Sequence, residues 1–566
     1  MSEKENFDAI VIGTGAGGAC AAYQLVNAGM RVLAIEKGPW LKLDDFLEGG
    51  AYGMPGGFSS WGRGDELKYS RQRLLQQNVP KELRWLSYHE YGQSAPDPRP
   101  TKRGWMSQLV GGGTVHYGGA SFRMEPVDFE MQSRFATQAK DLEQTNYADL
   151  GAEHSADLHD WPVSFAEFEP WFSEAERLVG IAAGPGSGLK PLRLSAAEKH
   201  IKTALEVANS EIELKPTPMA INSGKHMGRE ACHHSGLCQD YACRFEAKSD
   251  MRVTLLREAE KTGRLTIQPL SFVRKIHIKG SVAESLEVVV GDPEGGQAEI
   301  EKLTAPIIIV ACEALESCRL LAASGIGNPD VLGRYVMFHV TGGARSLAPI
   351  PTKAWQNAPH TGFIDHFYND HSNDSTPFIK TGIFLVSALG GPLQAVWRNW
   401  GADAIQYLNE IYPYKMDLSY IGEGLPTAHN RIELNTGTAD RYGMPGTIVH
   451  YRPHPFDINA GVYAGEKATE ILKIAGGTTH DEAPPELKKF LSKDVTARRM
   501  FHGSGGCRFG NDPKTSVLDR DCRVHGLDNL FVTDGSFMPT GSGVNPTLTI
   551  QANALRVGQR ITEMMQ

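Results

Sequence analysis

The first forty residues contain two short apolar runs separated by a helix-like segment. Residues 8–12 form the first run and stop at a glycine-rich turn, and residues 31–36 form the second. Continuous apolar runs of this length, bounded by glycine, are typical of strands buried on both faces of a parallel sheet. Two later runs, residues 265–269 and 305–310, are expected to return to the same sheet. The pattern predicts an α/β domain that opens on a strand, a helix and a strand.

The turn after the first run carries the glycine spacing of a dinucleotide site. Gly13 permits a tight turn, Gly15 lets the backbone approach a pyrophosphate, and Gly18 lets the helix pack closely on the strand. Glu36 ends the second run about 20 residues further on, where a carboxylate can bind ribose hydroxyls. Because strand, glycines, helix and acid occur together, we predict that a pyrophosphate binds at the N-terminus of the helix.

Composition narrows the class of protein further. A chain of 566 residues with 41% hydrophobic content can bury a large core and is long enough for more than one domain. Its net charge of -9 provides no basic surface for nucleic acid. The chain has no uninterrupted apolar run of about 18 residues and runs from a polar N-terminus straight into the first strand. We therefore expect no nucleic-acid partner, no membrane span and no signal peptide.

Several motifs along the chain identify a family by resemblance. The C-terminal region contains a His-Gly-Ser-Gly-Gly segment at 502–506, an aspartate-containing segment at 526–539 and an Asn-Pro-Thr segment at 545–547. Interior segments at 109–116, 307–317 and 324–327 occur in the same order as in that family. Together they resemble the glucose-methanol-choline oxidoreductases, which are FAD enzymes. The similarity extends over both ends and the interior, so it concerns the whole fold.

The resemblance implies an α/β FAD-binding, Rossmann-like domain interleaved with an α+β substrate domain built on an antiparallel sheet. Residues 1–345 would form mainly the FAD-binding domain, including inserted loops and a cysteine loop at 232–243. Residues 346–495 would form mainly the substrate domain, which contains alternating strand-like segments at 417–421 and 431–434. Residues 496–566 would return to the FAD domain with the catalytic residues.

The same resemblance assigns roles to individual residues. Oxidation of an alcohol needs a base near the flavin, and a neutral histidine suits this task. His502 would be this base and Asn545 would orient the substrate hydroxyl. His116 would either bond covalently to the flavin or only pack and hydrogen-bond there. The residues expected to bind FAD are Gly13, Gly15, Gly18, Glu36, Gly111, Gly112, Thr114, His116, Val273, Asp534, Pro546 and Thr547.

Three of the eight cysteines gather in one short segment, at Cys232, Cys238 and Cys243. Three thiolates on one loop can hold a soft metal centre. Zinc could use the same cysteines with His233 or His234, whereas a disulfide would leave one thiol over. In the sugar dehydrogenase branch of the family, a similar loop holds a 3Fe-4S iron-sulfur cluster. Five residues separate Cys232 from Cys238, as in that branch. Four residues separate Cys238 from Cys243, which is one more than is common there.

The resemblance to this branch implies a FAD-dependent dehydrogenase that oxidises a hydroxyl of a sugar, sugar acid or glycoside. Electrons would leave through the cluster to a cytochrome or quinone acceptor. Such catalytic subunits often pair with a small accessory subunit that carries a signal, so the chain would be cytoplasmic, or periplasmic through co-export. Two alternatives remain at this point: an oxygen-using sugar or alcohol oxidase, and a non-catalytic flavin redox partner.

Overall fold

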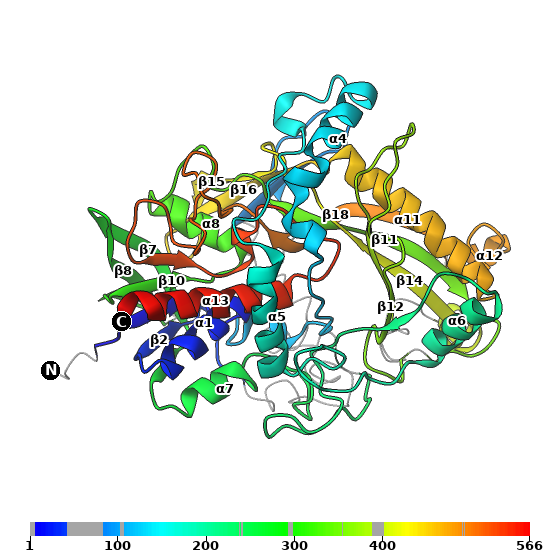
Figure 1. The fold of residues 1–566 in the computed structure, drawn as a ribbon, viewed down its shortest axis with the longest axis horizontal. Coiled ribbons are helices and arrows are strands. Elements are labelled where there is room, and N and C mark those ends of the chain that lie inside the picture. Colours follow the sequence, from blue (N-terminus) through cyan, green and yellow to red (C-terminus); the bar gives the residue numbers. More distant parts are fainter. Residues whose placement is uncertain are drawn as a thin grey trace.

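The computed structural model places two main sheets on opposite sides of the molecule (Figure 1). One is parallel and lies beside the two terminal helices, and the other is antiparallel and carries a long helix on one face. A fold that combines a Rossmann-like sheet with an antiparallel sheet confirms the predicted class. The structure describes residues 6–41, 83–101, 107–236, 238, 242–291, 298–353, 355–387, 401–488, 491 and 493–566.

The parallel sheet has the strand order β19-β10-β1-β2-β6. Its register pairs Ala9 with Ile307 on one side and with Val32 on the other. Every residue of its three central strands is buried, as the apolar runs predict. All four expected strands are confirmed, and a fifth joins from the C-terminal region. The bounds are β1 Ala9–Ile12, β2 Val32–Ile35, β6 Leu265–Gln268, β10 Ile307–Val310 and β19 Leu530–Val532.

Helix α1 (Ala16–Asn27) follows β1 directly and packs against the C-terminal helix α13 (Thr547–Met565). The two ends of the chain therefore meet on one face of the parallel sheet (Figure 1). Beyond β6, the chain forms a three-stranded antiparallel sheet before it returns to β10. That sheet and the neighbouring helices are β7 Ser271–Lys279, β8 Val282–Val290, β9 Glu299–Leu303, α5 Phe165–Val179, α7 Leu255–Glu260 and α8 Ala314–Ala323.

The second sheet has the order β17-β11-β14-β13-β12-β5, and β18 pairs with β11. Helix α11 (Pro455–Ile474) packs on β11 and β14, so its small buried residues close one face of the sheet. Segment 417–421 lies in β14, as predicted. The bounds are β5 Lys215–Pro216, β11 Met337–Leu347, β12 Gly362–Ile364, β13 Gly382–Val386, β14 Lys415–Gly422, β17 Thr478–Thr479, β18 Lys493–Ser504 and α6 Ala196–Val207.

A smaller sheet with the order β15-β16-β3-β4 takes in segment 431–434, which does not join the sheet under α11. Strands β11 and β18 both run across predicted domain boundaries, at residues 345 and 495, and those boundaries stay predictions. The bounds are β3 Arg84–Tyr88, β4 Arg99–Pro100, β15 Arg431–Ala439, β16 Pro445–Tyr451 and α4 Met131–Asn146.

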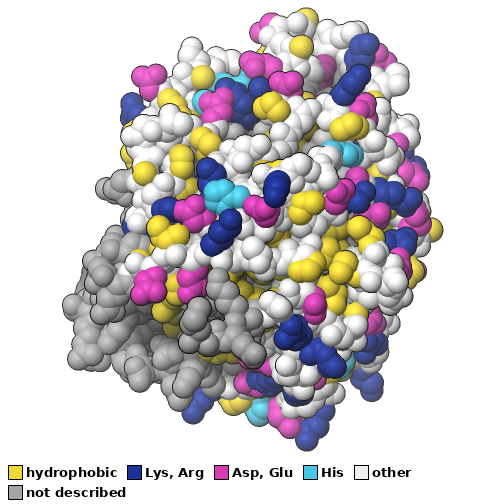
Figure 2. Space-filling model, turned by 90° about the vertical axis from the view of Figure 1, so that its left-hand side faces the viewer, with side chains coloured by type: hydrophobic (Ala, Val, Ile, Leu, Met, Phe, Trp, Pro, Cys, Tyr) yellow, Lys and Arg dark blue, Asp and Glu magenta, His cyan; other side chains and the backbone are white. Residues whose placement is uncertain are grey.

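Short helical turns complete the described structure, and none of the described helices is both long and apolar enough to span a bilayer. On the face shown in Figure 2, positive and negative side chains are interspersed, so that face has no field of a single sign. The short elements are η3 Gly112–Val115, η4 Pro126–Phe129, η5 Ala152–His154, η6 Tyr407–Ile411, η7 Tyr412–Tyr414, η8 Gly535–Phe537, α10 Gly401–Gln406 and α12 Pro485–Lys488.

Two glycines of the first turn should differ in how they tolerate a methyl group. A Cβ on Gly18 would lie 2.0 Å from the Gly13 carbonyl oxygen, whereas a Cβ on Gly15 would meet only the Gly112 Cα at 4.0 Å. We predict that Gly18→Ala lowers the free energy of unfolding by about 1–3 kcal/mol through overpacking. Gly15→Ala should change it by no more than about 0.5 kcal/mol. Thermal unfolding of both variants, stripped of bound nucleotide, measures this difference, and equal losses would contradict it.

Candidate active site

The N-terminus of α1 is open to a ligand. Its cap, Gly15, has no side chain, and no side chain within the described residues caps the helix. The first N–H groups of a helix have no partner inside it, so they can donate to a phosphate. Gly13 turns the chain with φ +100°, and its Cβ position lies 2.3 Å from the Ala311 carbonyl oxygen. Gly13 and Gly18 are thus required by backbone contacts, whereas Gly15 leaves space in front of the helix.

Glu36 lies directly after β2, as predicted. Part of its carboxylate binds groups of the protein, in the glycine turn after β1 and in the residues after β2. Its carboxylate accepts hydrogen bonds from the N–H and hydroxyl groups of Thr14, at 3.1 and 2.7 Å, and from the Gly38 N–H at 2.9 Å. Burial raises the pKa of Glu36, and these hydrogen bonds oppose that shift. A carboxylate has about four lone-pair sites, so room for one further donor, such as a ribose hydroxyl, remains.

A second glycine segment closes on the first. The Gly111 N–H donates to the Thr14 hydroxyl at 3.1 Å, and a Cβ on Gly112 would lie 2.9 Å from the Gly15 Cα. Both glycines have positive φ, +92° and +56°. The Thr114 hydroxyl donates to the Gly111 carbonyl at 2.7 Å and fixes this turn. The two segments therefore form one continuous cradle, as the resemblance implies.

His116 is buried beneath the same turn. Its Nε2 hydrogen-bonds the Ser107 hydroxyl at 2.6 Å, and its Nδ1 is buried without a partner. Burial is the main cause that lowers the pKa of His116 to about 3, so the ring is neutral. A neutral ring with a free nitrogen is compatible with either predicted role, covalent attachment or packing.

Two further residues expected to bind the cofactor lie along the edge of the parallel sheet. Val273 is buried in β7, two residues after Ser271, whose N–H donates to the Glu36 carbonyl at 2.9 Å. Asp534 follows β19 and is also buried. Its carboxylate accepts hydrogen bonds from the Ser317 hydroxyl and from Ser536. Burial raises the pKa of Asp534, and these hydrogen bonds oppose that shift.

His502 lies near the end of β18, where the strand is irregular. The register between β11 and β18 shifts on both sides of His339, and His502 itself has φ +56°. Bulges of this kind redirect a side chain out of the regular pleat. The His502 side chain is exposed, yet desolvation lowers its pKa to about 4. The exposed ring is accessible to a substrate, and its lowered pKa keeps it neutral, as a base must be.

A second histidine, His339 on β11, contacts His502 and was not predicted from the sequence. The two Nδ1 atoms lie 2.9 Å apart. The Ser542 backbone lies close enough to the His339 ring to favour its charged form, which opposes the effect of burial on its pKa. Burial lowers the pKa of His339 well below its usual range, so this ring is neutral and one of its two nitrogens can accept a hydrogen bond. In the tautomer in which His502 donates through Nδ1 to His339, the Nε2 of His502 keeps a free lone pair.

Asn545 lies three residues after Ser542, just before α13. Its carboxamide oxygen is buried without a hydrogen-bond partner. Pro546 and Thr547 begin the helix. The loop is supported from below, because the Gly543 N–H donates to the Tyr368 hydroxyl at 3.1 Å and that hydroxyl donates to Asp128 at 2.8 Å. The paired assignment of His502 and Asn545 stays a prediction, and the Asn545 loop adjoins His339 through Ser542.

A buried acid, Glu313, also lies next to this site. It caps α8 with φ +87° and its Oε2 is buried without a partner. A Cβ on Gly503, the residue after His502, would lie 3.3 Å from its Oε1. Burial raises the pKa of Glu313 to about 8, so the carboxyl is protonated at neutral pH. The sequence shows the acid, but not that it contacts the histidine segment.

The cysteine loop is described only in part, at Cys232, Cys238 and Cys243 among others. All three thiols are free, and at least one pair of their sulfurs is more than 4.8 Å apart. Each cysteine still affects the ionisation of a neighbouring one, so the three lie in one region. Burial raises the pKa of Cys238 to about 12.

The two histidines of the loop make contacts of their own, which leave ring nitrogens available. His233 stacks on Phe245 with ring centroids 4.2 Å apart, and His234 Nδ1 hydrogen-bonds Asn357 at 3.0 Å. A single zinc ion holds all its ligands within one small tetrahedron, which this loop does not form. A cluster distributes its thiolates over several irons and tolerates wider spacing.

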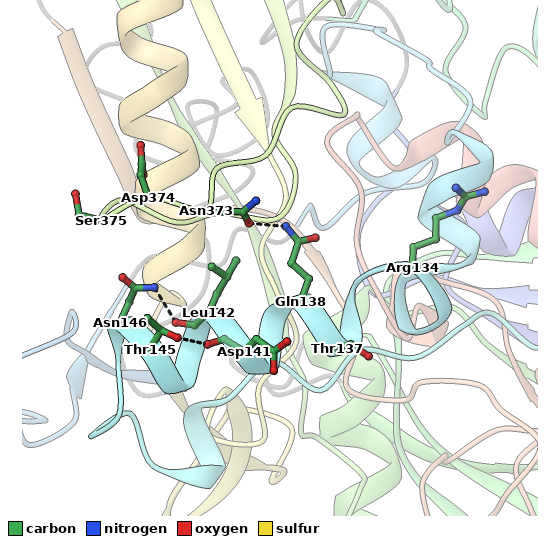
Figure 3. Close-up of a pocket in the computed structure, with 10 residues that line it drawn as sticks. All are labelled: Arg134, Thr137, Gln138, Asp141, Leu142, Thr145, Asn146, Asn373, Asp374 and Ser375. Atoms are coloured by element: carbon green, nitrogen blue, oxygen red, sulfur yellow. Dashed lines mark hydrogen bonds between the residues drawn. The ribbon is translucent and has the colours of Figure 1, made fainter.

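A hollow of about 810 Å³ lies elsewhere, on the outer face of α4 (Figure 3). Its wall consists of mostly polar side chains of α4 and of the loop at 373–375. Gln138 on α4 donates to Asn373 at 3.0 Å. None of the predicted site residues lines it. We assign no part of the chemistry to this hollow.

Comparison with known proteins agrees with this geometry. Two family models described as GMC oxidoreductase match residues 153–341 and 426–554, together more than half of the chain. A third, described as an NAD(P)-binding Rossmann-like domain, matches residues 11–41. These matches include the end of β1, all of α1 and β2, and the segments that carry His339, His502 and Asn545.

Individual relatives extend over nearly the whole chain. The 6'''-hydroxyparomomycin C oxidase of Streptomyces lividus is 28% identical over 98% of this chain and 91% of its own length. The gluconate 2-dehydrogenase flavoprotein of Pantoea cypripedii is 24% identical over 97% and 92%. A formate oxidase structure from Aspergillus oryzae has a TM-score of 0.64 at 12% identity, covering 100% of this chain and 99% of its own. The chain therefore belongs to the GMC oxidoreductase family.

Proposed function

We propose that this protein oxidises a hydroxyl group of a sugar-like substrate to a carbonyl, with FAD as its cofactor. The observation that carries the proposal is the contact between His339 and His502, whose Nδ1 atoms lie 2.9 Å apart; in the tautomer in which His502 donates, its Nε2 is a free base. The cradle formed by Gly15 and Gly112 fits a pyrophosphate, because both positions lack side chains where the α1 N-terminus opens. When bound, FAD supplies an acceptor for the hydride of the alcohol carbon.

The protein's own residues would act in a simple order. Asn545 offers its carboxamide to the substrate hydroxyl and orients it. His502 Nε2 takes the hydroxyl proton, which makes loss of hydride from the carbon easier. His339 accepts the hydrogen bond from His502 Nδ1 throughout, so it holds the tautomer and spreads the positive charge that the proton brings. In these roles His502 is a catalytic residue and His339 a positioning residue.

Two relatives suggest the class of substrate. Their names refer to hydroxyparomomycin and gluconate, which are sugar derivatives. We therefore extend the proposal to a sugar, sugar acid or glycoside. The identity of the oxidised carbon depends on the loops around His502.

The electron acceptor separates two versions of the function. In the first, the cysteine loop holds an iron-sulfur cluster, and electrons pass one at a time to a cytochrome-type acceptor, with an accessory subunit alongside. The cluster would be bound by Cys232, Cys238 and Cys243. In the second, oxygen reoxidises the flavin directly, and the name of the 28% identical relative, an oxidase, favours this version. The cluster version is supported by the three free thiols. The oxidase version is supported by the name of the Streptomyces lividus relative.

The histidine pair makes a graded prediction about rate. His502→Ala should slow flavin reduction by substrate by roughly 10² to 10⁴-fold, the range for loss of a general base. His339→Leu should slow it by roughly tenfold to a hundredfold, because the tautomer and ring position are no longer fixed. His339→Asn, whose side-chain oxygen replaces Nδ1 as acceptor, should recover part of the loss. Anaerobic stopped-flow spectroscopy measures all three rates.

The same experiment has a pH readout. Because the pKa of His502 is lowered to about 4, the base is neutral above that value, and the wild-type rate should fall only as pH drops through about 4. His502→Ala should lack this acid limb, while His339→Leu should displace it. If His339→Asn were as slow as His339→Leu and none of the variants altered the pH profile, the hydrogen bond from His502 to His339 would not serve the base.

The electron acceptor can be decided with one thiol variant. Under the cluster hypothesis, Cys238→Ser should still reduce its flavin in a single turnover but lose most steady-state transfer to a cytochrome-like acceptor. Cys20→Ser, a buried thiol in α1, is the matched control and should transfer normally. Hydrogen peroxide formed in equal amount to product by the wild type, with no iron in anaerobic preparations, would support the oxidase version instead.

The cradle predicts selective loss of cofactor. Gly15→Val should fold, since no described atom blocks its Cβ, but the larger side chain should occupy the space reserved for a pyrophosphate. The purified variant should therefore be colourless and regain little flavin on addition of FAD. A folded Gly15→Val protein that kept the wild-type amount of flavin would refute this placement.

A further inference from the structure

A cluster of histidines lies outside the proposed active site, where three distant segments meet. His89 follows β3, His154 ends η5, and His429 lies between β14 and β15. The His429 N–H donates to the Glu153 carbonyl at 2.8 Å, which joins two of the segments through their backbones. The rings of His154 and His429 have centroids 4.3 Å apart, and His89 meets the His429 ring edge-on at 5.3 Å.

The polar atoms of this cluster are poorly satisfied. His429 is 9% exposed, and both of its ring nitrogens are buried without a hydrogen-bond partner. His89 is 5% exposed, and its Nδ1 is also buried without a hydrogen-bond partner. An unpaired polar group in the interior is costly, and native proteins seldom retain several in one place without a ligand. The free nitrogens therefore indicate a bound group that can accept lone pairs.

The ligand atoms are already close enough for one ion. Glu153, His154 and His429 each offer one atom, and these three atoms all lie within 4.8 Å of one another. Zinc binds imidazole nitrogen at about 2.0–2.1 Å and carboxylate oxygen at about 2.0–2.2 Å. Rotation of the exposed Glu153 side chain and small movements of the two rings would bring all three atoms into that shell.

We propose that Glu153, His154 and His429 bind a divalent transition-metal ion of the zinc class. A water molecule or His89 would complete the coordination, since three protein ligands leave a fourth position open. The ion would tie η5 to the segment before β15, next to the end of β3.

The surrounding charges permit a cation. Arg452 and Arg431 both act on the histidines of the cluster. The guanidinium of Arg452 lies over the Tyr91 ring at 5.2 Å, and Arg431 is paired with Glu433 at 2.6 Å. The charge of Arg431 is therefore offset by a partner, and Glu153 contributes a negative charge directly to the ion.

Zinc binding to the holoenzyme tests the proposal. Protein without a histidine tag is treated with chelator, dialysed and titrated with Zn²⁺ in a calorimeter. We expect one site per chain that His429→Gln and His154→Gln each weaken at least tenfold. His159→Gln is the matched control, because it lies in the same loop but outside the group, and should bind as the wild type does. Cys238→Ser, run in parallel, should also keep this site.

Cobalt distinguishes the two sets of ligands even if a histidine variant folds poorly. Co²⁺ added to the wild type should give visible d–d bands without a thiolate-to-cobalt charge-transfer band, because the ligands are nitrogen and oxygen. A charge-transfer band that disappears in Cys238→Ser, with no remaining site, would assign the metal to the cysteine loop and overturn the proposal. Failure of the wild type to bind zinc, or unchanged binding by both histidine variants, would overturn it as well.

Discussion

The pairing of β11 with β18 is the constraint on which the proposed active site depends. A regular antiparallel ladder would keep the side chains of His339 and of the residues opposite it at ordinary cross-strand positions. Instead the register shifts on either side of His339, and Met500 and His502 take φ of +52° and +56°. Non-glycine residues in this region cost of order 1–3 kcal/mol each and persist only when their surroundings hold them. The strain here brings two imidazoles to 2.9 Å.

The glycines of the N-terminal turn show how packing and binding divide one motif. Gly13 and Gly18 are required by the protein itself, because a side chain at either position would collide with a carbonyl oxygen. Among the described residues Gly15 has no such neighbour, and the one atom near its Cβ position is the Gly112 Cα across the cradle. Protein packing alone does not require a glycine at position 15. Because this position lies in front of the free N–H groups of α1, a bound ligand best explains the glycine. The structure thus separates roles that the sequence pattern presents as one.

Local features could be predicted from the sequence and contacts between distant segments could not. The strands of the parallel sheet follow from apolar runs at residues 8–12, 31–36, 265–269 and 305–310, because burial on both faces leaves a continuous signal. His339 lies 163 residues before His502 and gives no signal of its own. The cluster of Glu153, His154 and His429 is invisible for the same reason, since its members meet only in the folded chain. Segment 431–434 alternates like any antiparallel strand, and alternation alone does not specify which sheet it joins.

The histidine pair also resolves a difficulty that burial creates for the base. A histidine with a pKa of about 4 is neutral at any physiological pH, but by the same measure it holds a captured proton weakly. Desolvation acts on the charged form, so a partner that favours the imidazolium can offset it without changing the resting state. His339 is such a partner, because its Nδ1 accepts from His502 more strongly once that ring is charged. In the proposed mechanism, desolvation therefore keeps the base neutral before the reaction, and His339 supports its charge during it.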